Sequence, residues 1–203
     1  VLPIVPQPTI NNVDALTRAF TSRGFAFSYF PTANEAARYI VSACAGKSVA
    51  LGGSMTFKEM DFPEAFADST EVHWHWVTKG EYYQTPDIYL TSANALSESG
   101  EAVNIDGTCN RVAGTLYGPK QCMFVCGINK LCPDLVSAVE RARNVAAPKN
   151  AQRLGTRTPC AADGKCHDCK SPARICRALV VHMGAPKGFE KCEIVLVGES
   201  LGY

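Results

Sequence analysis

The residues best suited to chemistry in this sequence are four closely spaced cysteines. They stand in the stretch PCAADGKCHDCKSPARIC with the spacing C-x5-C-x2-C-x6-C, as Cys160, Cys166, Cys169 and Cys176. The inner pair forms a C-x-x-C core, a spacing that lets two sulfur atoms converge on one centre. The aspartate, glycine and proline of the stretch favour turns, so we expect a loop folded around a metal.

Tetrahedral zinc and a [4Fe–4S] cluster both accept four thiolates, and the spacing alone does not separate them. We interpret the loop as a site for a [4Fe–4S] cluster, with zinc as the alternative metal and disulfides or reduced thiols as the metal-free alternatives. Four thiolate ligands would leave the cluster coordinatively full, for structure or electron transfer. Three would leave one iron open as a Lewis acid, with Cys160 or Cys176 as the non-ligand.

Positive charge surrounds these cysteines. Residues 149–177 contain seven Lys and Arg against two Asp, whereas the whole chain carries only +1. The local excess could balance an anionic thiolate-ligated cluster or attract an anionic substrate, and a solvated loop face is the simpler alternative. The near-neutral total argues against a nucleic-acid partner.

The composition is that of a soluble globular protein. The chain has 203 residues, of which 46% are hydrophobic and 19% are charged. We expect a single domain over residues 11–203, preceded by an N-terminal arm, residues 1–10, that lacks the features of a signal peptide. No run of eighteen apolar residues predicts a membrane span. The six other cysteines are scattered, several of them in apolar runs, which is typical of a reducing cytoplasm.

Hydrophobic periodicity predicts that strands and helices alternate along the chain. Helices are expected over residues 12–23, 32–44, 92–96 and 133–145, and strands over residues 25–30, 48–51, 71–77, 87–91, 101–105, 121–126, 178–183 and 193–197. Thr32, with Glu35 three residues on, is a capping box that opens the second helix. Such alternation predicts an α/β fold with a layered, largely parallel sheet. The cysteine-rich loop, residues 155–177, would be an insertion between a late helix and the last two strands.

Polar residues follow several of the predicted strands. Gly52, Gly53 and Ser54 come directly after the strand at residues 48–51, with Thr56 close behind. Glycines let a backbone approach a ligand, and the amides that begin the next helix favour an anion, although a plain tight turn is the alternative. The alternating stretch EVHWHWV puts two histidines on one strand face, and of these His75 is the candidate for a substrate contact.

Two more polar loops carry side chains that could bind an anion. One contains Asn110 and Arg111, and the other contains Asn129 and Lys130. Because parallel strands bring their carboxyl ends to one edge, we expect these loops to meet there and the cysteine loop to fold over them. Arg111 is the predicted catalytic guanidinium, suited to a bidentate grip on a carboxylate or phosphate.

Four stretches of this chain together resemble the LUD (lactate utilization) domain family. They are GGSMTFKEM, SANALSESGEAVNIDGTCNRVAGTLYGPKQ, CGINK and EIVLVGESLGY. The cysteine loop resembles the subgroup of that family with a C-terminal cysteine motif. The resemblance implies a fold similar to the sugar-phosphate isomerase and coenzyme A transferase superfamily. It also implies a link to oxidation of lactate or another small hydroxy acid, alongside iron–sulfur partner proteins. One departure is Cys109, where the family is expected to carry a glycine.

The stretch Ser97-Glu98-Ser99-Gly100 is similar to the S-E-N-G signature of family I coenzyme A transferases, in which the glutamate is the nucleophile. The resemblance implies that Glu98 acts as a base or a nucleophile. The alternative is a solvated glutamate at the end of a helix.

The leading hypothesis is therefore an iron–sulfur enzyme, or a redox subunit of one, that acts on a small anionic metabolite such as lactate or another hydroxy acid. A zinc-stapled binding or regulatory module and acyl or coenzyme A transfer through Glu98 are the alternatives. The sequence does not determine the oligomeric state, and a homodimer is one of the possible states.

Overall fold

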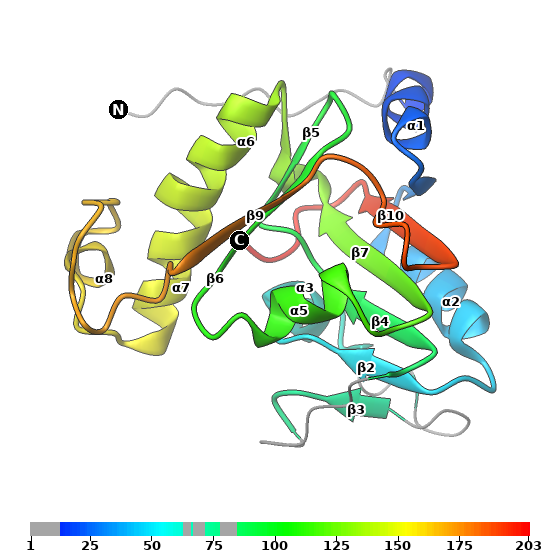
Figure 1. Cartoon of the computed structure of the whole chain (residues 1–203), viewed down its shortest axis with the longest axis horizontal. Helices are drawn as coiled ribbons and strands as arrows, with labels where there is room; N and C mark the ends of the chain where they lie inside the picture. The colour runs from blue at the N-terminus through cyan, green and yellow to red at the C-terminus, as the bar shows by residue number, and fades with distance from the viewer. Residues whose placement is uncertain (1–12, 63–65, 67–71, 78–84) are drawn as a thin grey trace.

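The computed structural model describes residues 13–62, 66, 72–77 and 85–203 (Figure 1). The expected N-terminal arm and Glu71, where the third strand was predicted to begin, lie outside the described residues. None of the helices in the described part of the chain is long and apolar enough to cross a membrane.

Within the described residues, the larger of two sheets has six strands, all parallel, in the order β1-β10-β7-β4-β2-β3. The strands are β1 (Ala26–Phe30), β2 (Val49–Leu51), β3 (Val72–Trp74), β4 (Ile88–Thr91), β7 (Gln121–Gly127) and β10 (Lys191–Val197). The helices are α1 (Val13–Ser22), α2 (Ala33–Cys44), α3 (Met55–Glu59), α5 (Asn110–Leu116), α6 (Leu135–Arg141), α7 (Ala147–Leu154) and α8 (Pro159–Asp163). The α/β class and the largely parallel sheet predicted from the sequence are confirmed.

Both faces of this sheet are covered, and alternate residues of its strands enter different cores. On β7, Phe124 packs in the core shared with α1, whereas Met123 packs in the core shared with α2 and α3. Such strands are nearly continuous apolar runs, because parallel sheets bury both faces. The capping box that opens α2 is present: Thr32 Oγ1 accepts from the Glu35 N–H, and the Thr32 N–H donates to the Glu35 carboxylate.

The smaller sheet has four strands in the order β8-β5-β6-β9 and lies between the larger sheet and α6. Its strands are β5 (Ala95–Ser97), β6 (Ala102–Asp106), β8 (Leu131–Cys132) and β9 (Ala178–His182). The helix predicted over residues 92–96 is wrong. Leu96 instead pairs with Ala102 of β6 and with Leu131 of β8. Neither partner lies at the spacing of three or four residues that a helix would bring together.

The helix predicted over residues 133–145 is longer than expected and begins later. Asp134 is its N-cap, and α6, a π-helical turn (Ala142–Ala146) and α7 run on to Leu154 (Figure 1). Pro148 sits inside this helix, where it lacks an N–H and its ring would collide with the carbonyl four residues back. The preceding turn is widened, so that the Ala147 N–H donates to the Ala142 carbonyl five residues back. The widened turn accommodates the proline and lets the helix continue.

Two segments near the site also differ from the expected pattern. β3 ends at Trp74, so the strand predicted through residue 77 is too long, and His75 lies in the turn that follows. The cysteine loop follows α7, as predicted, and contains the short helix α8 before it leads into β9 (Figure 1).

Candidate functional site

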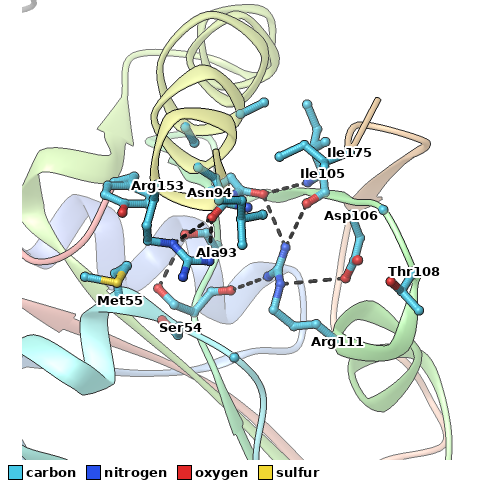
Figure 2. Close-up of a pocket in the computed structure, with 18 of the residues that line it drawn as sticks. Ser54, Met55, Ala93, Asn94, Ile105, Asp106, Thr108, Arg111, Arg153 and Ile175 are labelled. Atoms are coloured by element: carbon cyan, nitrogen blue, oxygen red, sulfur yellow. Dashed lines mark hydrogen bonds and ion pairs between the residues drawn. The ribbon is translucent and has the colours of Figure 1, made fainter. Parts of the chain in front are cut away.

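A polar pocket of about 250 Å³ lies where the large sheet ends. Gly53 and Ser54 follow β2, His75 follows β3, Ser92 follows β4 and Lys130 follows β7. All of these strands are parallel, so their carboxyl ends meet at the same edge, as expected for ligand sites in α/β sheets. Helix α7 closes the opposite wall. Figure 2 shows Arg153 of that helix and Arg111 of α5 approaching the pocket from two sides, with Ser54 between them in this view.

Lys130 is the most unusual group in the pocket. Its side chain is 3% exposed, and its Nζ donates to Ser92 Oγ at 2.8 Å and to Thr56 Oγ1 at 2.9 Å. Both partners are neutral hydroxyls. Burial therefore lowers the pKa of Lys130 to about 8, and the nearby positive charges of Arg141 and Arg111 add to the shift. A buried amine without a carboxylate partner favours either proton loss or an anionic ligand.

Arg111, the predicted catalytic guanidinium, is already engaged by the protein. Its two terminal nitrogens donate to four acceptors: the carbonyl oxygens of Ser92 and Ile105 and the side-chain oxygens of Asn104 and Asn94. Its Nε lies 3.7 Å from the carboxylate of Asp106. These contacts tie the end of β4 to β6, so Arg111 is a brace that adds positive charge to the pocket. The bidentate grip expected of it would require breaking them.

Arg153 was missed as an individual residue, although it lies in the basic stretch noted above. It is solvent-exposed, and its guanidinium lies 5.1 Å from the ring centroid of Trp76 and donates to Asn150 Oδ1. Such a stacked, exposed cation can turn to a ligand at little cost. Gly53 makes room for this arrangement, because a Cβ there would collide with the indole of Trp76.

His75 and Asn110, both predicted to contact substrate, do lie side by side at the pocket. Asn110 Nδ2 is 3.1 Å from His75 Nε2. Cys109, which precedes Asn110, has φ of 67° and so occupies the left-handed region that favours glycine. The glycine expected at this position therefore has a conformational reason, and the cysteine adopts the same backbone with strain.

Three of the predicted substrate-binding residues support the pocket from behind. Gly52 continues β2 by donating its N–H to the Leu90 carbonyl, and Thr56 is fully buried beneath Lys130. Asn129 ties down the C-terminal residues, since its Oδ1 accepts from the Leu201 N–H and its Nδ2 donates to the Gly202 carbonyl. None of the three is among the described residues that line the pocket.

Glu98 lies elsewhere, in the tight connection between β5 and β6. The residues around it form a structural cluster in which Ser97, Ser99 and Arg23 all contact the buried carboxylate of Glu101. Glu98 is not among the described residues lining the polar pocket or the cysteine cavity below. The geometry therefore separates the Ser-Glu-Ser-Gly motif from the other candidate residues.

A second cavity, of about 260 Å³, lies beside the first and is formed largely by the cysteine loop. Cys160, Cys166 and Cys176 line this cysteine cavity, and Cys169 does not. All four thiols are partly exposed and none forms a disulfide. Ile105 and Ala147 line both cavities, so the two sites share a wall. The cysteine loop thus comes near the sheet edge as the sequence argument expected, and Ile175 reaches the polar pocket itself.

Arginines hold the cysteine loop in place. Arg174 donates to the Cys169 carbonyl at 2.7 Å, and its Nε lies 3.1 Å from Cys176 Sγ. The negative charge available at Cys176 raises the pKa of Arg174. Asp168 bridges Arg174 of the loop and Arg143 of the π-helical turn, with both N–O distances at 3.2 Å.

The donor set of this loop fits a thiolate-ligated metal in its chemistry. It offers four free thiols, three of them facing one cavity, with Arg143, Arg174 and Arg177 around it to balance a net negative cluster. Within the described residues, however, no three His, Cys, Asp or Glu side chains are already gathered at metal-binding distance. Binding would therefore draw the loop together, which couples metal uptake to ordering of the loop.

Comparisons with known proteins place the chain in a family. Among solved structures, it is similar to a DUF162 family protein from Deinococcus radiodurans, with a TM-score of 0.54 and 14% sequence identity over 91% of this chain and 95% of that one. At this identity the likeness shows the fold. No curated protein matches the sequence. The family model of the LUD domain matches residues 13–197, and the chain belongs to the LUD domain family.

Proposed function

We propose that this protein binds a small anionic metabolite in the polar pocket and a [4Fe–4S] cluster in the adjacent cysteine loop. The metabolite class is a carboxylate such as lactate or another hydroxy acid, which agrees with the association of the LUD family with lactate utilization. The protein would then be an iron–sulfur enzyme or a redox subunit of one.

The observation that carries the proposal is the buried ammonium group of Lys130. Its two hydrogen-bond partners are uncharged, so a ligand carboxylate would supply the missing negative charge. Among the described lining residues, Lys130, Arg111 and Arg153 face only one carboxylate, that of Asp106. The Asp106 carboxylate already forms an ion pair with Arg111 and accepts a hydrogen bond from the Val112 N–H at the start of α5. The pocket therefore has net positive charge at neutral pH, which favours an anion.

The shared wall supports a connection between the two cavities. Ile105 and Ala147 separate them by single side chains, so a cluster in the cysteine cavity would lie close to a metabolite in the pocket. When bound, a [4Fe–4S] cluster supplies one-electron transfer. The chain's own residues would bind and orient the metabolite: Lys130 at the floor, Arg153 at the rim, and His75 with Asn110 along one side.

Calorimetric titration tests the metabolite site. L-lactate and its analogue oxamate should bind the wild-type protein at neutral pH, and affinity should fall as pH rises through about 8, because Lys130 loses its charge there. Lys130→Met should abolish both the binding and this pH dependence. Lys58→Met, at an exposed lysine of α3, is the matched control and should bind as the wild type does. Equal binding by wild type and Lys130→Met would refute the pocket assignment.

Anaerobic purification followed by iron and acid-labile sulfide analysis tests the cluster. We expect equal amounts of both elements and a brown colour that is lost in air. Stoichiometric zinc without sulfide would instead favour the zinc-stapled module. Replacing the buried Cys44 with alanine should leave the metal content unchanged, whereas Cys166→Ala and Cys169→Ala should each lose the metal.

A further inference from the structure

We propose that Ser92 is a nucleophile, activated by Lys130, for acyl transfer from an ester or thioester that carries an anionic group. This activity goes beyond the proposed function, because it needs neither the cysteine loop nor a metal. It uses two groups that meet at the floor of the polar pocket: Lys130, which the sequence marked only as a candidate to bind an anion, and Ser92, which the sequence did not single out.

The geometry at Ser92 is that of a serine–lysine pair. Ser92 follows β4 and lines the pocket, and its Oγ lies 2.8 Å from Lys130 Nζ. Both side chains are nearly buried, at 4% and 3% exposure, so water competes little for either group. The loop that carries Ser92 is fixed on one side by Arg111, which donates to the Ser92 carbonyl, and on the other by Cys126 Sγ, which accepts from the Ala93 N–H at 3.3 Å. The nucleophile and its base are therefore held in reach of one another before any substrate arrives.

Thr56 completes a closed circuit of hydrogen bonds. Lys130 Nζ is 2.9 Å from Thr56 Oγ1, and Thr56 Oγ1 donates to Ser92 Oγ at 3.2 Å. With Lys130 neutral, its N–H donates to Thr56, Thr56 donates to Ser92, and the Ser92 O–H donates to the free lone pair of Lys130. Both hydroxyl hydrogens and one N–H of the amine then have an acceptor within the circuit, and the lone pair of Lys130 has a donor. The hydrogen bonds of the site are thus compatible with the neutral amine that a general base requires.

Burial makes this neutral state accessible near physiological pH. It brings the pKa of Lys130 to about 8, close to the value at which a general base is most effective. Asp87 and Lys120, whose pKa values are also shifted, form an exposed ion pair away from the pocket and take no part. The groups that face Lys130 are Thr56, Ser92 and Cys126, with Glu59, Arg111 and Arg141 acting on it by charge.

The step balances without an external oxidant. Ser92 Oγ attacks the carbonyl carbon and gives its proton to Lys130 Nζ, and an Oγ–C bond forms. The C–O or C–S bond to the leaving group then breaks, and Lys130 returns the proton to the departing oxygen or sulfur. Water, or another acceptor nucleophile, releases the acyl group from Ser92 by the reverse sequence.

The positive pocket selects the substrate class. Arg153 at the rim is free of carboxylate partners among the described contacts and can pair with an anionic group on the acyl chain or the leaving group. Arg111 adds positive charge near the Ser92 carbonyl without leaving its own acceptors, and this field favours the oxyanion formed during attack. Substrates with a carboxylate or phosphate should thus react faster than neutral ones.

Covalent labelling tests the proposal directly. The purified protein is treated with 4-nitrophenyl hemisuccinate, an activated ester with a free carboxylate, and with a fluorophosphonate. Release of nitrophenolate is followed, and the modified peptide is identified by mass spectrometry. We expect one acyl or phosphonyl group on Ser92, at a rate that rises with pH around 8 as Lys130 loses its proton. Lys130→Met should slow labelling by about 100-fold or more.

Matched variants separate chemistry from folding. Ser92→Ala should abolish labelling, Ser92→Cys should restore it, and Ser42→Ala, at an exposed serine of α2, should react as the wild type does. Thermal unfolding of each variant shows whether it is folded. Absence of labelling in folded wild-type protein, or equal labelling of Ser92→Ala, overturns the proposal. Equal rates with neutral 4-nitrophenyl acetate overturn the anionic substrate class. Because iron content is measured separately, failure here and failure of the cluster assignment are distinguishable.

Discussion

The polar pocket and the cysteine cavity share a wall but differ in what holds their residues in place. Lys130, Thr56 and Ser92 are nearly buried at the end of the large sheet, and Arg111 braces them through protein acceptors. The four cysteines are partly exposed on a loop, which is held mainly by Arg174 and by ion pairs at the surface. Buried hydrogen bonds of charged groups contribute more to stability than exposed ion pairs do. The pocket is therefore prepared in advance of its ligand, whereas the cysteine loop depends on its occupant for its final geometry.

Removing one metal ligand should affect the two regions very differently, and this is the largest effect we expect. Cys166→Ala should lose essentially all bound metal and should loosen residues 155–177, because ligation and ordering of the loop are coupled. Hydrogen exchange should show increased exchange in the loop and unchanged protection of β4 and β7. A Cys166→Ala protein whose strand ends exchange as fast as its loop would show that the pocket also depends on the cluster.

Two arginines allow a matched test of the same contrast. Arg111→Leu should lower the free energy of unfolding by about 3 kcal/mol, because it removes the charged donor from the carbonyl of Ser92 and the side-chain oxygen of Asn104, both buried residues, and breaks two further hydrogen bonds. Arg174→Leu should lower it by less than about 1 kcal/mol, since the Arg174 side chain is 31% exposed and water can replace it. Urea unfolding measures both values. Similar losses in the two variants would contradict the distinction between a rigid pocket and a dependent loop.

The pKa of Lys130 predicts a pH dependence of stability with a definite sign. Because it falls from 10.5 to about 8 on folding, the unfolded chain binds more protons between these values. Stability contributed by this residue therefore rises as pH increases from about 8 to 10.5, by up to roughly 3 kcal/mol. The difference between the unfolding curves of wild type and Lys130→Met over this range isolates the effect. A difference that does not change with pH would mean that folding does not lower the pKa of Lys130.

The smallest effect should come from the ion pairs that join the cysteine loop to the long helix. Asp168→Asn removes the bridge between Arg143 and Arg174. Because these groups are exposed, global stability should change by less than about 1 kcal/mol. Extraction of the metal by a chelator should nevertheless become a few-fold faster, since the loop loses an anchor. An unchanged extraction rate would show that the cysteines alone determine how firmly the metal is held.

Much of the fold follows from local sequence patterns. Most of the six parallel strands were predictable because they are short apolar runs, and β3 was predictable from its alternating pattern. The Thr32–Glu35 capping box marked the start of α2. In the smaller sheet, β6 and β9 match predicted strands, whereas β5 and β8 were missed because they are too short to show an alternating pattern. β5 has three residues and β8 has two, and both are stabilised by partners distant in sequence. Such pairing is a tertiary effect that residues 92–96 alone do not reveal.

The site was predictable in part for the same reason. The rule that polar loops gather at the carboxyl ends of parallel strands brought Gly53, Ser54 and Lys130 to one pocket, and Asn110, which follows β6 of the smaller sheet, lies at the same pocket. Ser92 also follows a strand, and applying the rule to the end of β4 would have found it. Whether Arg111 is free to bind a ligand depends on acceptors contributed by two separate segments, residues 92–94 and 104–105, which no single motif records.

The π-helical turn lets chain length vary without moving the pocket wall. Because the Ala147 N–H donates to a carbonyl five residues back, the turn over Ala142–Ala146 holds one residue more than an ordinary α-helical turn. Deleting that residue would restore the ordinary helical repeat and keep the residues that follow on nearly the same face, so Asn150 and Arg153 would stay at the pocket. Straightening the turn at unchanged chain length would instead rotate all that follows by about 100° and carry both side chains away. In comparing relatives, a gap of one residue here would therefore be compatible with an unchanged ligand.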